Sequence, residues 1–211
     1  MHRNIDMKSF ILLALSVVLT MNSAFCQGEI EVIGSKDQMQ TLFGYNSKIT
    51  GYGAMDTRFS LINGKESVIV GGHGGVIFNS YFYLGLGAYG LATTQNIATD
   101  PLDVPLDMQM GYTGLMLGMN VLPKKVVHFS IPLFVGVGNL VMEKNDARLE
   151  TSPFIIIEPG LQLEVNLVRF MKVGLGGGYR MVRGSSLNYD ISDADLTSWS
   201  GNFSLIFGKF K

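Results

Sequence analysis

The sequence predicts an all-β fold, an eight-stranded antiparallel transmembrane up-and-down β-barrel. Three observations predict it. From residue 49 onward, apolar residues alternate with small or polar residues at a period of two rather than about 3.6. The alternating segments number eight, an even number as in bacterial single-chain barrels, and each exceeds the roughly 9–11 residues that a tilted strand needs to cross a bilayer. The connections are mostly short at one end and long at the other.

The expected strands follow one another along the chain. They are Ile49–Ile62, Lys65–Phe78, Tyr81–Thr94, Met108–Leu122, Val126–Glu143, Phe154–Val168, Met171–Gly184 and Leu196–Phe210. Between the first two, Asn63-Gly64 is typical of a two-residue type I′ hairpin. Pro132 and Pro159 fall inside the fifth and sixth segments, where each removes a hydrogen-bond donor from the ladder. We expect β-bulges there, with a wrongly placed strand as the alternative.

The connections suggest how the barrel is oriented. Short linkers stand at Asn79-Ser80, Pro123-Lys124-Lys125 and Arg169-Phe170, and longer polar ones at Gln95–Asp107, Lys144–Pro153 and Ser185–Asp195. With the N-terminus in the periplasm, every short linker except Asn63-Gly64 is periplasmic and all three longer ones are extracellular, as in outer-membrane barrels.

The last segments show most clearly which face meets lipid. In the final one, Trp199, Phe203, Leu205 and Phe207 occupy one phase, and serine, asparagine and glycine the other. Across the chain the polar phase is mainly Gly, Ser, Asn and Tyr, including Tyr83, Tyr89 and Tyr112, with few charges. This composition suits a narrow packed lumen and places the apolar phase in hydrocarbon. A soluble lipocalin-like barrel, with the apolar phase inward, is the alternative.

Charged side chains in the inward phase predict a polar network in the lumen. Its expected members are Asp56, Arg58, His73, Glu158, Glu164, Lys172 and Arg180. A tight turn near Arg169 would set Glu158 opposite Arg180 and Asn166 opposite Lys172. The first pairing would give the buried Glu158 carboxylate the cationic partner that it needs. Eight strands leave room for side chains but not for a water channel, so we expect a plugged barrel that conducts nothing.

Bulk properties agree with an envelope protein. The chain has 211 residues, of which 47% are hydrophobic and only 16% charged, below the quarter typical of soluble domains. The formal net charge is −1, so the basic footprint of a nucleic-acid-binding protein is missing and no such partner is expected. We expect no cofactor.

Residues 1–26 resemble a secretory signal peptide. Arg3 and Lys8 precede the apolar run Phe10–Thr20, which is too short to span a bilayer comfortably. Cys26, the only cysteine, is either a lipoprotein acylation site or the last residue of the leader; the bulky Phe25 before it favours the leader.

Residues 27–48 form the expected periplasmic segment before the barrel, which spans 49–211. Met39, Leu42 and Phe43 have the i, i+3, i+4 spacing of a helix. We expect a short helix at the barrel mouth, with a disordered leader as the alternative.

Several motifs resemble those of uncharacterised small outer-membrane β-barrel proteins of Bacteroidetes-type bacteria. They are Gly51-Tyr52-Gly53, Arg58-Phe59-Ser60, Ile62-Asn63-Gly64-Lys65, Val70 to Gly75, Gly85 to Gly90, Glu158-Pro159-Gly160 and Phe207-Gly208-Lys209-Phe210. The likeness covers about Leu42 to Phe210 and departs at Ala54-Met55 and His73. It implies an outer-membrane location and no particular activity.

Candidate catalytic residues are few. His128-Phe129-Ser130 with Glu143 is similar to the His-x-Ser arrangement of outer-membrane lipid A deacylases, in which a serine needs a base and an orienting carboxylate. However, His128 would lie beside a periplasmic turn, point into the lumen and face Asn120, whereas lipid A occupies the outer leaflet. A hydrogen-bonded lumen histidine is the simpler interpretation.

Two further motifs have ordinary explanations. Gly71-Gly72-His73-Gly74-Gly75 lacks the Lys-Ser/Thr and helix of a phosphate loop, and its glycines can relieve crowding in the lumen. Acidic residues gather in two outer loops, namely Asp100, Asp103 and Asp107 in one and Asp190, Asp193 and Asp195 in the other. They could hold divalent cations, although solvated carboxylates are commoner.

The leading functional hypothesis is therefore a non-enzymatic outer-membrane barrel with a plugged lumen and a structural or surface-interaction role through its extracellular loops. Expected partners are outer-membrane lipid, lipopolysaccharide and the barrel-assembly machinery. The alternatives are a lipid-modifying enzyme using His128 and Ser130, and a soluble periplasmic ligand carrier.

Overall fold

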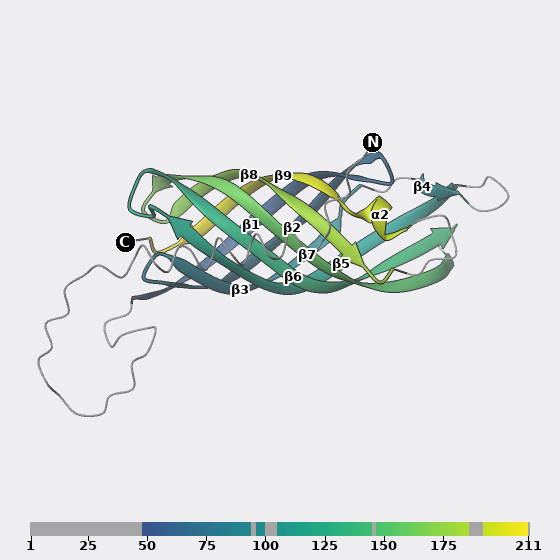
Figure 1. Ribbon diagram of the computed structural model, residues 1–211, viewed down its shortest axis with the longest axis horizontal. Coiled ribbons are helices and arrows are strands. Elements are labelled where there is room, and N and C mark those ends of the chain that lie inside the picture. The colour runs from purple at the N-terminus through teal and green to yellow at the C-terminus, as the bar shows by residue number, and fades with distance from the viewer. Residues whose placement is uncertain (1–47, 94–95, 100–104, 145–146, 186–191, 211) are drawn as a thin grey trace, which may run out of the picture. The chain divides into compact units, whose positions relative to one another are not determined.

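The computed structural model describes residues 48–93, 96–99, 105–144, 147–185 and 192–210. The expected signal peptide and all but the last residue of the expected N-terminal segment lie outside them. The described residues form one closed antiparallel sheet, which confirms the eight-stranded barrel (Figure 1). Its strands are β1 (Ile49–Ile62), β2 (Lys65–Phe78), β3 (Phe82–Leu91), β4 (Asn96–Thr99), β5 (Pro105–Val121), β6 (Val127–Lys144), β7 (Ala147–Val168), β8 (Met171–Arg183) and β9 (Ser198–Gly208).

The ring closes where the first strand meets the last. β1 pairs with β9 from Tyr52↔Gly208 to Ser60↔Ser200, and the other pairs join strands that follow one another in sequence, except that β3 pairs with β5 and not with β4. β3 and β4 both pair with β5 but along different parts of it, so together they occupy one position in the ring. We call the end where β1 begins and β9 ends the turn end, and the opposite end, with β4 and the helix α2 (Asp193–Leu196), the loop end (Figure 1).

The loop end contains two elements that the alternation did not predict. β4 lies within the expected loop Gln95–Asp107 and extends the hairpin with β5 past the end of β3. The short helix α2 begins after Ser192, whose backbone N–H and hydroxyl both donate to the Asp195 carboxylate, at 2.8 and 2.6 Å. A serine followed three residues later by an acid is the sequence signature of such a cap.

Side chains alternate across the wall as the pattern predicts. Trp199 is 74% exposed on the outer face, and Phe203 and Phe207 lie on the same face, whereas Ser200 and Ser204 are buried inside. This arrangement is the reverse of a lipocalin-like carrier, whose apolar side chains would fill the interior. In the part of the chain that the structure describes, no helix has the length and hydropathy needed to cross a membrane.

The interior also contains an apolar cluster that was not predicted. Toward the loop end, inward-facing residues of several strands and Leu196 of α2 pack together; they include Ile62, Ile69, Met108, Leu140, Met142, Ile156 and Val182. β5, β6 and β7 are long, with β7 running over 22 residues, and so extend beyond what a bilayer requires. At the loop end, the inward-facing side chains of these long strands close the lumen with a small hydrophobic core.

Glycines make room for the large lumen side chains. A Cβ on Gly118 would collide with the ring of Tyr83, and a Cβ on Gly71 would lie 2.5 Å from Cδ1 of Tyr89. For Gly71 this agrees with the expectation that glycines of this run relieve crowding in the lumen, whereas the atoms nearest to a Cβ on Gly72, Gly74 or Gly75 are backbone atoms of the neighbouring strands.

The expected bulges at the prolines are absent from the described ladder. Pairing runs in one register across both residues, from Ser130↔Gln162 to Leu133↔Pro159. The register shifts lie elsewhere, at Asn96/Ala98, Met142/Glu143 and Asn166/Val168. Gly160 lies beside one of these prolines: Pro132 Cγ is 3.1 Å from the position that a Cβ of Gly160 would occupy, so the absence of that Cβ leaves room for the ring within the ladder.

Candidate functional site

The barrel interior brings together all seven residues predicted for the lumen network. Alternate residues of β1 supply Asp56 and Arg58, and register places Ser204 and Asn202 of β9 beside them. His73 comes from β2, Glu158 and Glu164 from β7, and Lys172 and Arg180 from β8. Six of these side chains are buried and His73 is nearly so, with its side chain 11% exposed.

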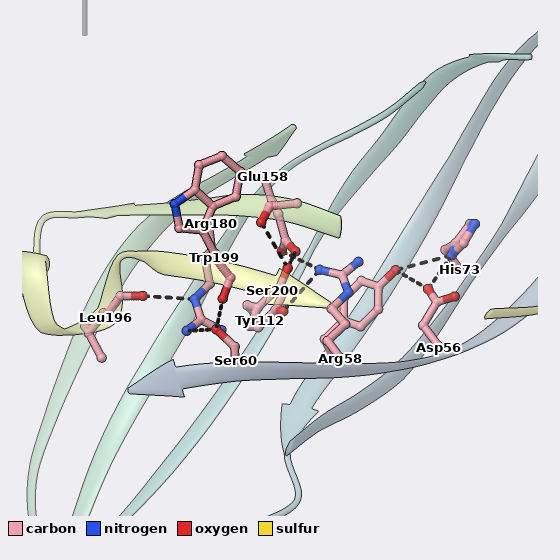
Figure 2. Close-up of polar contacts among 12 residues, drawn as sticks. Asp56, Arg58, Ser60, His73, Tyr112, Glu158, Arg180, Leu196, Trp199 and Ser200 are labelled. Atoms are coloured by element: carbon pink, nitrogen blue, oxygen red, sulfur yellow. Dashed lines mark hydrogen bonds and ion pairs between the residues drawn. The ribbon is translucent and has the colours of Figure 1, made fainter. Parts of the chain in front are cut away.

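An ion pair between Arg58 and Glu158 lies at the centre (Figure 2). The hydroxyl of Ser200 donates to Glu158 at 3.0 Å, and Arg58 Nη1 donates to the hydroxyl of Tyr112 at 3.3 Å. The guanidinium also lies 3.7 Å from the ring centre of Tyr89, a cation–π contact. Because both charges are buried, their pairing offsets the large cost of removing each from water.

A second cluster joins Asp56, His73 and Tyr89. The Tyr89 hydroxyl donates to Asp56 Oδ2 at 2.7 Å, and His73 Nδ1 lies 2.7 Å from the same oxygen. Figure 2 shows Asp56 and His73 facing each other from neighbouring strands. Since Tyr89 also contacts Arg58, the two clusters form one continuous network.

A third cluster lies nearer the turn end. His128 Nε2 is 3.0 Å from Glu164 Oε2, and Lys172 Nζ is 3.3 Å from that oxygen and from His128 Nε2. Lys172 also lies over the ring of Phe210, 4.3 Å from its centre. This cluster pairs the buried Lys172 with a carboxylate, which satisfies the requirement for a buried charge.

Arg180 has different partners from those predicted. The register is right, because Asn166 pairs with Lys172 and Ile157 with Met181, but Glu158 forms its ion pair with Arg58. Arg180 donates instead to Ser60 Oγ at 3.1 Å and to the carbonyls of Leu196 and Leu61 at 2.9 and 3.2 Å (Figure 2). The guanidinium thereby ties α2 to the barrel wall.

Several members of the network were not predicted. Tyr112 was assigned to the lumen but not to Arg58, and Ser60 and Ser200 were not assigned to the network. All three stand in the inward phase of their strands, which is the signal that could have found them. Their particular partners follow from contacts across the lumen, which strand pairing does not specify.

The lipid-modifying alternative needs a serine, a base and a carboxylate in one place. His128 and Ser130 do point inward and are 1% exposed, but His128 contacts Glu164, and Ser130 Oγ lies 3.0 Å from the hydroxyl of Tyr83. His128 and Glu143 stand near opposite ends of β6. The described geometry therefore does not assemble the triad.

The predicted neighbour of His128 was wrong. Asn120 pairs with Ser130, not His128, because the turn between β5 and β6 is wider than expected and Val121↔Phe129 is the last pair before it.

Little space remains inside the barrel. A cavity of about 40 Å³ lies beside the network and is lined by Tyr52, Asp56, His73 and Gln162, among others. A single water needs about 10–15 Å³ measured in this way, so the cavity is large enough for a few waters and far too small for an organic ligand. The interior is filled by side chains.

The acidic loops are only partly described. Asp100, Asp103 and Asp190 lie outside the described residues, and within those residues no group of three or more His, Cys, Asp or Glu side chains is placed to hold a metal. Asp193 accepts hydrogen bonds from the backbone N–H groups of Gly184 and Ser185 at 3.1 and 2.9 Å. Partial burial raises the pKa of Asp193, but these bonds and that from the Ser185 hydroxyl outweigh it and hold the pKa below its usual range.

Comparisons with known proteins bear on the fold. The N-terminal β-barrel domain of OprF from Pseudomonas aeruginosa superposes with a TM-score of 0.52 at 9% identity, over 76% of this chain and 99% of that one. Neisserial surface protein A (NspA) superposes with a TM-score of 0.50 at 8% identity, over 78% and 99%. The fold is that of an outer-membrane β-barrel.

Sequence comparison adds nothing to this result. No protein-family model matches the chain, and a search of curated proteins finds no significant match. At such low identities the structural likeness establishes the fold alone. The resemblance to Bacteroidetes-type barrel proteins stays a prediction.

Proposed function

We propose that this protein resides in the outer membrane of a Gram-negative bacterium after cleavage of residues 1–26, and that it acts without catalysis as a structural or surface-interaction protein. Its extracellular loops would contact other molecules at the cell surface. Lipopolysaccharide would surround the barrel wall, and the barrel-assembly machinery would insert the protein into the membrane. The observation that supports this most directly is the interior: ion pairs and packed aromatic rings fill it and leave a cavity of about 40 Å³.

A filled interior has two consequences for function. Among the described residues, side chains fill the axis and leave a cavity of about 40 Å³, so we expect no passage of solutes, and the surfaces that remain for recognition are the two ends and the outer wall. The loop end is the better candidate for contacts outside the cell, because it carries the two longest connections, from β3 to β5 and from β8 to β9, which contain β4 and α2.

The proposal is tested by surface labelling of intact cells. A short epitope inserted within residues 186–191 should be accessible to antibody on whole cells. The same epitope at Arg169-Phe170 should become accessible only after the outer membrane is permeabilised. Equal labelling of the two on intact cells would contradict the proposed orientation.

The enzymatic alternative has its own test. Lipid A from a deletion strain should have the mass profile of the parent, and the Ser130→Ala protein should complement any envelope phenotype of the deletion. A changed lipid A profile that Ser130→Ala fails to restore would replace the structural role with a catalytic one.

A further inference from the structure

The turn end of the barrel has a fixed rim. Asn166 Nδ2 donates to the carbonyl of Lys125 at 2.9 Å, and Asn120 Nδ2 donates to the carbonyl of Ser80 at 3.0 Å. The backbone N–H of Phe210 donates to the carbonyl of Arg169 at 3.2 Å. These bonds connect each turn to a neighbouring element, so side chains carried by the rim keep a defined spacing.

A pocket of about 370 Å³ opens within this rim, and its charge has one sign. Lys124, Arg169, Lys172 and Lys209 line it, together with polar residues such as Asn120 and Asn166. Among the described residues that line the pocket there is no aspartate or glutamate. Lys172 forms an ion pair with Glu164, which does not line the pocket. No carboxylate among the described lining residues balances the charges of Lys124, Arg169 and Lys209.

Phe210 separates this pocket from the interior. Its side chain lines both the pocket and the small inner cavity, packs against the apolar core and covers Lys172. Lys172 is 5% exposed, so a buried ammonium forms part of the floor while three exposed cations surround the opening. Potentials from several like charges around one concave site add together and concentrate counter-ions there.

We propose that this pocket binds a soluble polyanion, a small solute carrying several phosphate or carboxylate groups. A polyanion is favoured because each exposed lysine or arginine contributes little alone, whereas one ligand can contact several of them at once. A solute is favoured over a lipid headgroup because the inward-facing Lys172, Asn120 and Ile77 line the pocket, whereas lipid surrounds the outer wall. Its volume lies in the range of small-molecule sites. The inference is independent of what the extracellular loops contact.

The test uses the full mature chain folded in zwitterionic detergent, with inorganic tripolyphosphate as the probe and calorimetry as the readout. We expect saturable binding that weakens as salt rises. Arg169→Ala and Lys209→Ala should each weaken it roughly 3-fold, and the double variant about 10-fold. These side chains are exposed at the rim, so the variants should fold, which heat-modifiable migration will check.

Arg183→Ala is the matched control, because it removes one exposed cation from the loop end of β8. It should leave binding unchanged. Equal weakening by Arg183→Ala, or no saturable binding by the parent protein, would overturn the proposal. A second measurement compares phosphatidylglycerol around the parent protein and the double variant in nanodiscs. If tripolyphosphate does not bind and phosphatidylglycerol is enriched around the parent only, the rim is a lipid contact and the proposal is overturned.

Discussion

Single residues inside the barrel are held by partners from distant strands. Arg58 meets Glu158 across the lumen, and hydroxyls of Ser200 and Tyr112 complete their hydrogen bonds. Removing one member of a buried pair costs more than removing both, because the remaining charge is left uncompensated.

Arg58→Met should therefore lower the free energy of unfolding by about 3–5 kcal/mol, since it leaves the buried Glu158 carboxylate without its cation. The double variant Arg58→Met/Glu158→Gln should recover a large part of that loss. Urea unfolding of the barrel in lipid, followed by tryptophan fluorescence and gel migration, measures both. Glu158→Gln alone is the remaining single variant. If the loss of unfolding free energy in the double variant equals the sum of the losses in the two single variants, the ion pair does not contribute to stability.

Gly118 allows a similar test of packing. Gly118→Ala would push a methyl group into the ring of Tyr83 and should cost about 1–3 kcal/mol of unfolding free energy. Gly201→Ala is the matched control, because no atom lies within 4 Å of its ideal Cβ. Tyr83→Leu in the Gly118→Ala background should relieve the clash. Equal costs at Gly118 and Gly201 would mean that crowding by Tyr83 is not the reason for the glycine.

At the scale of elements, side-chain contacts join α2 to β8 in the described part of the loop end. Asp193 accepts bonds from Gly184 and Ser185, and Arg180 holds the carbonyl of Leu196. β4 extends one hairpin beside this region. The described part of the loop end therefore holds its elements in fixed positions.

The hydrogen bonds from Gly184 and Ser185 to Asp193 should weaken as pH falls. The lowered pKa of Asp193 means that its ionised form is favoured in the folded loop, so its contribution is complete above the usual value of 3.8 and is lost as pH falls through the lowered pKa. Hydrogen exchange of the Gly184 and Ser185 amides should therefore show protection that declines in this window. Asp193→Asn should remove the pH dependence of exchange at these two amides. If the pH dependence persists in that variant, a group other than Asp193 is responsible for it.

For the whole molecule, the decisive property is the orientation of the wall. Leu175 is 60% exposed on the outer face of β8. If that face meets hydrocarbon, Leu175→Arg should cost about 2–4 kcal/mol, while Val126→Arg beside a turn should cost about 0–1 kcal/mol. Unfolding in lipid vesicles measures both. Similar small losses at the two positions would argue against insertion at this depth.

Periodicity in the sequence was enough to predict the strand number, the faces and most strand ends to within one residue. The predicted long linker Lys144–Pro153 was wrong, because β7 begins at Ala147 and not at Phe154. β1 and β2 have the expected bounds, because Asn63-Gly64 marks the turn between them. The prediction failed where another effect outweighed the local pattern. The ladder kept one register across Pro132 and Pro159, where Gly160 leaves room for the Pro132 ring, and inward-facing apolar residues obscured the alternation at the loop end.

The sequence by itself determined which side chains point into the lumen, because a strand's side chains alternate and a tight turn sets the register of its neighbours. The seven predicted lumen residues all lie there. Only the tertiary structure decided which of them touch. Arg58 and Glu158 are 100 residues apart and on strands that are not neighbours in the ring. Their meeting depends on barrel diameter and on the stagger of all eight strands together, which no local segment encodes.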